Sequence, residues 1–154
     1  MISSNLVVNM SKIELSLRLH GKLPPTEELN SLLGVVPTIA FRQGQIVGKR
    51  RIQPTDVWCL SLAEIECSGT ENEIDQMKKQ MQQAVAGLQQ VAPALAALDR
   101  SACKVELYIS TIRQEDRGGF SLPGGIIAAA AAANLSSIEV SILVMLDDYE
   151  EPEI

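Results

Sequence analysis

Apolar and polar residues alternate without a break from residue 12 to residue 20, which predicts a strand with one face in a core. The apolar positions of this strand are Ile13, Leu15, Leu17 and Leu19. Residues 103–112 and 137–146 repeat the alternation, and residues 58–67 follow it with one irregularity. That irregularity is typical of a bulge near Ala63 or of a twisted strand end.

The segments between the expected strands carry helical patterns. Residues 26–33 predict a short helix with Thr26 as its N-cap and Gly34 as its stop. A longer helix is expected over residues 73–99, where apolar residues recur at spacings of three and four. It can form a coiled coil or lie across the sheet, and the second is favoured because the sheet needs a cover. Pro93 predicts a kink or a division of this helix.

A last helix is expected over residues 123–133, which end in a run of alanines, with Asn134 as its stop. The element order is then β-α-β-α-β-α-β. Strands buried on both faces of a parallel sheet are apolar throughout, whereas most strands here are polar on one face. We therefore expect a single α+β domain over residues 1–146, with an about four-stranded, largely antiparallel or mixed sheet and helices packed on one face.

The strand expected at residues 137–146 differs from the others because Leu143, Met145 and Leu146 add apolar residues to its second face. Either this strand is central in the sheet, or a partner subunit covers that face. A homodimer through residues 137–146 is therefore one expected assembly.

The net charge of −6 is concentrated at one end of the chain. Five carboxylates fall within residues 147–154, and without these five the formal net charge rises from −6 to −1. We expect this acidic tail to be disordered. Neither a neutral body nor an acidic tail suits nucleic acid, which attracts basic surfaces. No signal peptide and no membrane span are expected.

Composition offers little chemistry for catalysis. A chain of 154 residues buries enough surface to fold without a disulfide or a metal. Its three cysteines lack metal-ligand spacing, which favours free thiols in the cytoplasm. His20 is the only histidine and has no partner nearby in the sequence, and the glycine-rich residues 118–125 match no phosphate-binding motif. We expect no enzyme activity, no cofactor and no metal.

Residues 35–56 are rich in turn signals and are expected to be irregular. They hold the densest positive charge of the chain. The candidate binding residues, with the tryptophan that follows, are Arg42, Gly44, Lys49, Arg50, Arg51 and Trp58. An acidic protein partner or a small anionic ligand fits this segment. The alternatives are a solvated loop or neutralisation by the acidic tail. The polar sheet face, with Glu14, Arg18, Glu106 and Tyr108, is the next candidate surface.

The chain resembles the mainly bacterial family called domain of unknown function 4279 over about residues 12–146. The resemblance rests on the first strand, the helix before Gly34, Val36-Pro37-Thr38, Arg42-Gln43-Gly44, Trp58 and Phe120-Ser121-Leu122. It implies a small α+β cytoplasmic protein and no established activity. We expect a non-enzymatic protein-binding module, immunity-like by analogy of fold. The alternative is a small-molecule or anion-binding protein that uses residues 42–51.

Overall fold

The strand with the strict alternation lies at the centre of the sheet. The computed structural model describes residues 11–67, 73–113 and 121–145, and this strand is β1 (Ser11–Gly21). Its apolar residues are buried, and Leu17 is 0% exposed, as the alternation predicts. The polar residues between them are half-buried. Alternation with a period of two thus separates a covered face from an open one.

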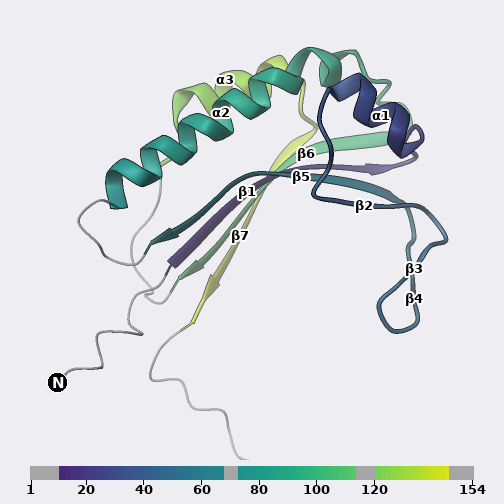
Figure 1. Cartoon of the computed structure of the whole chain (residues 1–154), viewed down its shortest axis with the longest axis horizontal. Coiled ribbons are helices and arrows are strands. Elements are labelled where there is room, and N and C mark those ends of the chain that lie inside the picture. The colour runs from purple at the N-terminus through teal and green to yellow at the C-terminus, as the bar shows by residue number, and fades with distance from the viewer. Residues whose placement is uncertain (1–10, 68–72, 114–120, 146–154) are drawn as a thin grey trace, which may run out of the picture.

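Three helices cover one face of a mixed five-stranded sheet (Figure 1). The strands after β1 are β2 (Ile39–Phe41), β3 (Ile46–Val47), β4 (Arg51–Ile52), β5 (Asp56–Cys67), β6 (Cys103–Arg113) and β7 (Ser137–Val144). The helices are α1 (Thr26–Leu33), α2 (Glu73–Ala97) and α3 (Gly124–Ala132). The strand order is β2-β5-β1-β6-β7, and β3 and β4 form a separate hairpin. All neighbours in the larger sheet are antiparallel except β6 and β7, which are parallel.

The expected α+β class is therefore confirmed, with the sheet mixed and the helices on one side. The sheet face without helices is called the open face below. Residues 35–56 are more regular than expected, since they contain β2, β3 and β4. These strands have two or three residues each, too few for an alternating pattern to show in the sequence.

The irregular alternation of β5 comes from a bulge. Leu15 of β1 pairs with Ala63, whereas the next residue, Ser16, pairs with Ser61. Leu62 is therefore the extra residue, one position from the expected bulge. Because of the bulge, both Trp58 and Ile65 lie buried on the helix-covered face.

Helix α2 lies across the sheet, so the coiled-coil alternative is wrong. Its residues Ala84, Leu88 and Val91 are 0% exposed, and Leu88 and Val91 belong to the same core cluster as Leu17. Pro93 lies inside one continuous helix and does not divide it in two.

The two short helices, α1 and α3, end at the residues that the sequence predicts, but α1 begins differently from the prediction. Gly34 closes α1 in the left-handed region (φ 73°), and Asn134 follows α3 with φ 54°. The predicted N-cap Thr26 is wrong, because Pro25 holds the cap position without a side-chain hydrogen bond. The proline ring holds φ at −51° there, and Thr26 begins the helix itself.

Arg100 joins the C-terminal ends of α2 and α3. Its guanidinium donates hydrogen bonds to the carbonyl oxygens of Leu95 (2.8 Å), Ala133 (2.8 Å) and Asn134 (2.7 Å). Carbonyl groups at a helix C-terminus have no partners within the helix and carry partial negative charge. A single cation thus satisfies the ends of two neighbouring helices.

Replacing Arg100 by methionine should lower the free energy of unfolding by about 1–2 kcal/mol, because three charge-assisted bonds are exchanged for bonds to water. Urea unfolding measures this value. Lys104→Met, which removes an exposed cation from the adjacent β6, is the matched control and should change stability by less than about 0.5 kcal/mol. Equal effects of the two substitutions would show that the bridge between the helices contributes nothing.

The expectations for the cysteines and for the acidic tail concern residues that the structure describes only in part. Cys103 is buried and Cys59 is half-buried, and both are free thiols. The acidic tail, residues 147–154, lies outside the described residues. No helix in the described ranges is both long and apolar enough to cross a membrane.

Candidate functional site

The strand register aligns chemically distinct side chains in rows across the open face. One row runs from Ile39 of β2 through Cys59 of β5 and Arg18 of β1 to Glu106 of β6. Neighbouring strands lie about 4.8 Å apart, so adjacent members of a row are within reach of one another. This row brings together Arg18 and Glu106, which are 88 positions apart in the sequence.

The second row lies two residues further along each strand. It runs from Phe41 of β2 through Val57 of β5 and His20 of β1 to Lys104 of β6. The two rows together are apolar on the β2 side of the open face and charged on the β1 and β6 side. This gradient is the arrangement needed to orient a ligand that has one apolar end and one charged end.

The polar side chains of these rows hold one another in place. The Arg18 guanidinium lies over the Tyr108 ring, 4.2 Å from its centroid, which is a cation–π contact. His20 Nε2 lies 3.2 Å from Glu106 Oε1, and the Glu106 side chain is 13% exposed. His20 therefore has the carboxylate partner that its sequence neighbours do not provide. Contacts of this kind fix side chains before a ligand arrives.

Cys59 lies in the first row beside Arg18. Burial raises the pKa of the Cys59 thiol above its ordinary value, and the nearby Arg18 opposes that rise without cancelling it. The thiol is therefore protonated at neutral pH, and a protonated thiol is a poor nucleophile.

The β3–β4 hairpin flanks the β2 side of the open face (Figure 1). Its cross-strand pairs are Ile46 with Ile52 and Val47 with Arg51. Paired residues share a face of the hairpin. Val47 and Arg51 line the space beside the sheet, while Ile46 and Ile52 are 73% and 67% exposed.

The hairpin and the open face border a wide, open depression of about 420 Å³, called the hairpin pocket. Its lining residues are Arg18, His20, Ile39, Phe41, Val47, Arg51, Gln53, Thr55, Val57 and Cys59. Two arginines and a histidine line it together with four large apolar side chains, and no carboxylate does. A cavity of this size holds a small organic molecule.

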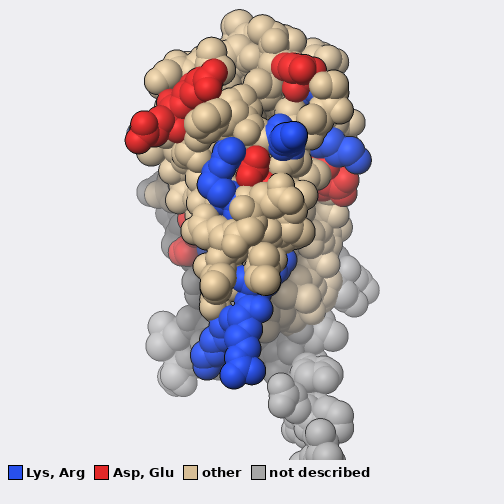
Figure 2. All heavy atoms as spheres, turned by 90° about the vertical axis from the view of Figure 1, so that its right-hand side faces the viewer, with Lys and Arg blue, Asp and Glu red and all other residues tan. Residues whose placement is uncertain are grey.

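Of the cations expected in the site, only Arg51 lines this pocket. Lys49 and Arg50 are exposed at the turn of the hairpin, where Gly48 and Arg50 have φ of 64° and 69°. Figure 2 shows positive charge gathered at the lower end of the described surface, where Figure 1 places β3 and β4. Gly44 lies at the base of the hairpin, and its N–H donates to the carbonyl oxygen of Gln53 (2.9 Å).

Arg42 is engaged with other residues of the chain although its side chain is 41% exposed. Its guanidinium lies 3.3 Å from Asp56 Oδ2 and donates to the carbonyl oxygens of Pro24 (2.8 Å) and Leu23 (3.1 Å). Asp56 also accepts hydrogen bonds from the backbone N–H groups of Leu23 (2.9 Å) and Gln43 (2.8 Å). Arg42 and Asp56 therefore anchor the segment before the hairpin to the segment after β1.

The charge state of Asp56 fits this anchoring role. Burial acts to raise the pKa of Asp56, but the two backbone hydrogen bonds, with Arg42 and Lys22, outweigh burial and leave the pKa below its ordinary value. The carboxylate is thus ionised at neutral pH although it is only 8% exposed.

Trp58 lies on the other side of the sheet from the pocket. It is 1% exposed in the helix-covered core, and its indole N–H donates to Asn30 Oδ1 of α1 at 2.9 Å. Trp58, one of the candidate binding residues, thus packs in the core and does not line the pocket, whereas the neighbouring Val57 and Cys59 do.

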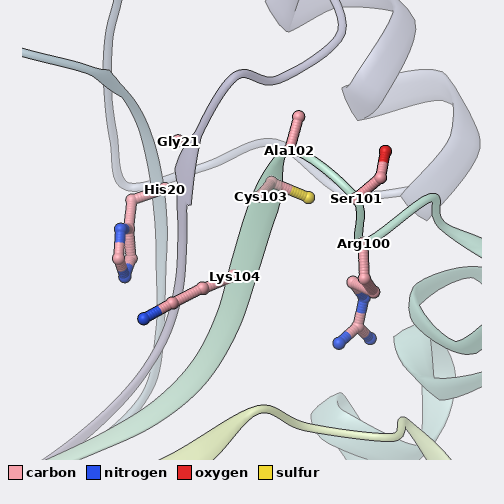
Figure 3. Close-up of a pocket in the computed structure, with 7 residues that line it drawn as sticks. All are labelled: His20, Gly21, Arg100, Ser101, Ala102, Cys103 and Lys104. Carbon is pink, nitrogen blue, oxygen red and sulfur yellow. The ribbon is translucent and has the colours of Figure 1, made fainter.

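A second cavity, of about 320 Å³, lies where β1 ends and β6 begins. Figure 3 shows His20 and Lys104 on one side of the β6 ribbon and Arg100 on the other. Arg100 is bound to the helix ends, and the Cys103 thiol donates to the carbonyl oxygen of Asp99 (3.2 Å). Two residues of this second cavity are thus engaged with backbone carbonyl groups, whereas the hairpin pocket combines two arginines with an apolar wall, which makes the hairpin pocket the better candidate. Nowhere in the described ranges do three or more His, Cys, Asp or Glu residues gather as a metal site.

These features define a class: an α+β protein with a mixed sheet, helices on one face and a cationic, partly apolar pocket on the other. The model of the family described as Domain of unknown function (DUF4279) matches residues 11–145. The chain belongs to this family, as the resemblance implies. No curated protein and no solved structure matches the chain.

Sequence reasoning placed part of this site and missed part of it. Arg51 was included, and Arg18 was assigned to the polar sheet face. The pairing of His20 with Glu106 was missed because it depends on the register of β1 against β6. The sequence did carry one indication of this pairing. His20 and Glu106 both alternate with buried residues in their strands, so both were expected on the polar face of the sheet.

Proposed function

We propose that the protein is a non-enzymatic binding protein and that its ligand is a small organic anion with an apolar group, held in the hairpin pocket. The observation that carries the proposal is the lining of that pocket. Arg18 and Arg51 supply hydrogen-bond donors, whereas Phe41 and the aliphatic residues beside it supply an apolar wall. Arginine forms paired bonds to carboxylate and phosphate, so either group fits the charged end.

Binding is favoured over catalysis because the reactive groups in the pocket are already engaged. The Cys59 thiol is held protonated by burial, and His20 lies beside Glu106. The free thiols of Cys59 and Cys103 suit a reducing compartment, and we include a cytoplasmic location in the proposal.

A role in binding an acidic protein, immunity-like or otherwise, is the second candidate. The observation that favours it is the exposed turn of the hairpin, where Lys49 and Arg50 lie between the strands that carry the exposed apolar pair Ile46 and Ile52. A protein partner would contact this outer surface rather than the pocket. The two candidates therefore assign function to different cations of one hairpin.

The first test uses 4-phenylbutyrate as the anionic probe and 4-phenylbutan-1-ol as its neutral counterpart. The anion is expected to raise the melting temperature, because a ligand at 100 times its dissociation constant adds about 2.7 kcal/mol of stability. The alcohol is expected to bind at least tenfold more weakly, since it forms no charge-assisted bond. Calorimetric titration gives both dissociation constants.

Matched substitutions locate the binding site. Arg51→Ser should weaken binding of 4-phenylbutyrate tenfold or more, because one charge-assisted bond is lost. The double variant Lys49→Ser, Arg50→Ser removes two exposed cations outside the pocket and should change the affinity less than twofold. Loss of binding in the double variant with retention in Arg51→Ser would contradict the pocket and favour a partner at the hairpin turn.

A further inference from the structure

Strand β7 leaves one whole side of its backbone without a partner strand in the described part of the chain. It has eight residues and pairs only with β6, in parallel. The opposite edge of the sheet is protected, since β2 has three residues and leads into the hairpin. Long, regular edge strands readily pair with other chains, and monomeric proteins shorten or charge them. Strand β7 is long for an edge strand and carries a single charged residue, Glu139.

The side chains of β7 are apolar and exposed on the helix-covered face of the sheet. The parallel register places Ile138 beside Leu107 and Val140 beside Ile109, both of which are fully buried. The apolar residues of β7 on that face are Ile138, Val140, Ile142 and Val144, which are 41–61% exposed. The helices therefore stop short of β7 and leave an apolar strip at the edge of the core.

The open face of β7 is apolar as well at its C-terminal end. Leu143 is 54% exposed and Met145, just after the strand, is 52% exposed. Glu139 is the only charged residue between Ser137 and Met145. The apolar second face of this strand had two explanations, a central place in the sheet or a partner subunit. Strand β7 lies at the edge, so the partner subunit is the explanation that remains.

We propose that β7 pairs antiparallel with β7 of a second copy of this chain, about a two-fold axis through Ser141. An axis perpendicular to the sheet keeps both helix layers on the same side. Ile138 then lies opposite Val144 of the second copy, and Val140 lies opposite Ile142. The two apolar strips thus form one continuous strip across the new sheet.

The same register keeps the two Glu139 residues of the dimer apart. Glu139 lies opposite Leu143 of the second copy, and the two Glu139 residues are four positions apart along the strands, about 14 Å at ~3.4 Å per residue. Like charges directly opposite one another would oppose pairing, and this register has none.

Analytical ultracentrifugation of the full chain tests the proposal. The expected mass is twice the 16.7 kDa of one chain. Val140→Lys should weaken the dimer at least a hundredfold, since it places two lysines next to the axis. Ile46→Lys changes an apolar residue that is 73% exposed on the hairpin and should leave the dimer intact. Circular dichroism and the melting temperature establish that both variants are folded.

A second variant tests the register and does not depend on the effect of lysine. Ser141→Cys places two thiols opposite one another at a Cα distance of about 5 Å, which suits a disulfide. Copper phenanthroline should convert this variant into a covalent dimer, whereas Ser137→Cys should cross-link far less. A wild-type chain that is monomeric at 1 mM, or a dimer unaffected by Val140→Lys, would overturn the proposal. So would a monomer that binds an extended peptide along β7.

Discussion

Leu17→Ala is expected to lower the free energy of unfolding by about 2–5 kcal/mol, the range for removing a large apolar side chain from a core. Leu17 is 0% exposed and lies at the centre of the strand that pairs on both sides. It packs in one cluster with Leu88 and Val91 of α2, so the substitution leaves a cavity between the sheet and its helix cover. Urea unfolding measures the change.

The neighbouring position gives the matched control. Ser16→Ala changes the open face of the same strand and is expected to alter stability by less than about 0.5 kcal/mol. A loss below half a kcal/mol for Leu17→Ala, or equal losses for both variants, would contradict the assignment of the two faces.

Asp56→Asn is expected to cost about 2–4 kcal/mol, because Arg42 and both backbone N–H groups lose their charged acceptor. The amide has only one oxygen, so one of the two backbone N–H groups is also left without any acceptor. The Asp56 side chain is only 8% exposed, so water replaces these bonds poorly. Asp75→Asn, at an exposed position of α2, is the control and should have little effect.

The pH dependence of this loss follows from the direction of the pKa shift. The pKa of Asp56 in the folded protein lies below the ordinary value of 3.8. The contribution of Asp56 is therefore fully present above about pH 5, and it disappears as the pH falls through the folded pKa. The difference in stability between the wild type and Asp56→Asn should be constant from pH 5 to 8 and shrink below pH 4. A difference that stays constant down to pH 2.5 would contradict this account.

The parts of the fold predicted from the sequence are those where burial is periodic. The alternation along β1 and the spacing of three and four along α2 each reflect one covered face, so pattern and structure agree. Gly34 stops α1 for a local reason, its left-handed backbone, which the residue type itself indicates.

The features that the sequence did not reveal depend on pairings between distant segments. The Asp56 carboxylate accepts a hydrogen bond from the backbone N–H of Leu23, 33 residues earlier, and no local sequence pattern predicts that bond. The same anchor engages Arg42, and the hairpin turn places Lys49 and Arg50 in solvent, so a segment with four cations supplies only Arg51 to the pocket. The exposed edge at β7 depends on strand order, and alternation does not encode strand order.

The most direct test of the anion-binding proposal is a ¹H–¹⁵N correlation spectrum recorded during titration with 4-phenylbutyrate. The proposal predicts that the largest shifts are those of the Arg18, His20, Val57 and Arg51 amides, which surround the hairpin pocket. Shifts confined to Ser101 and Ala102 at the second cavity, or no saturable shift at millimolar probe, would contradict it.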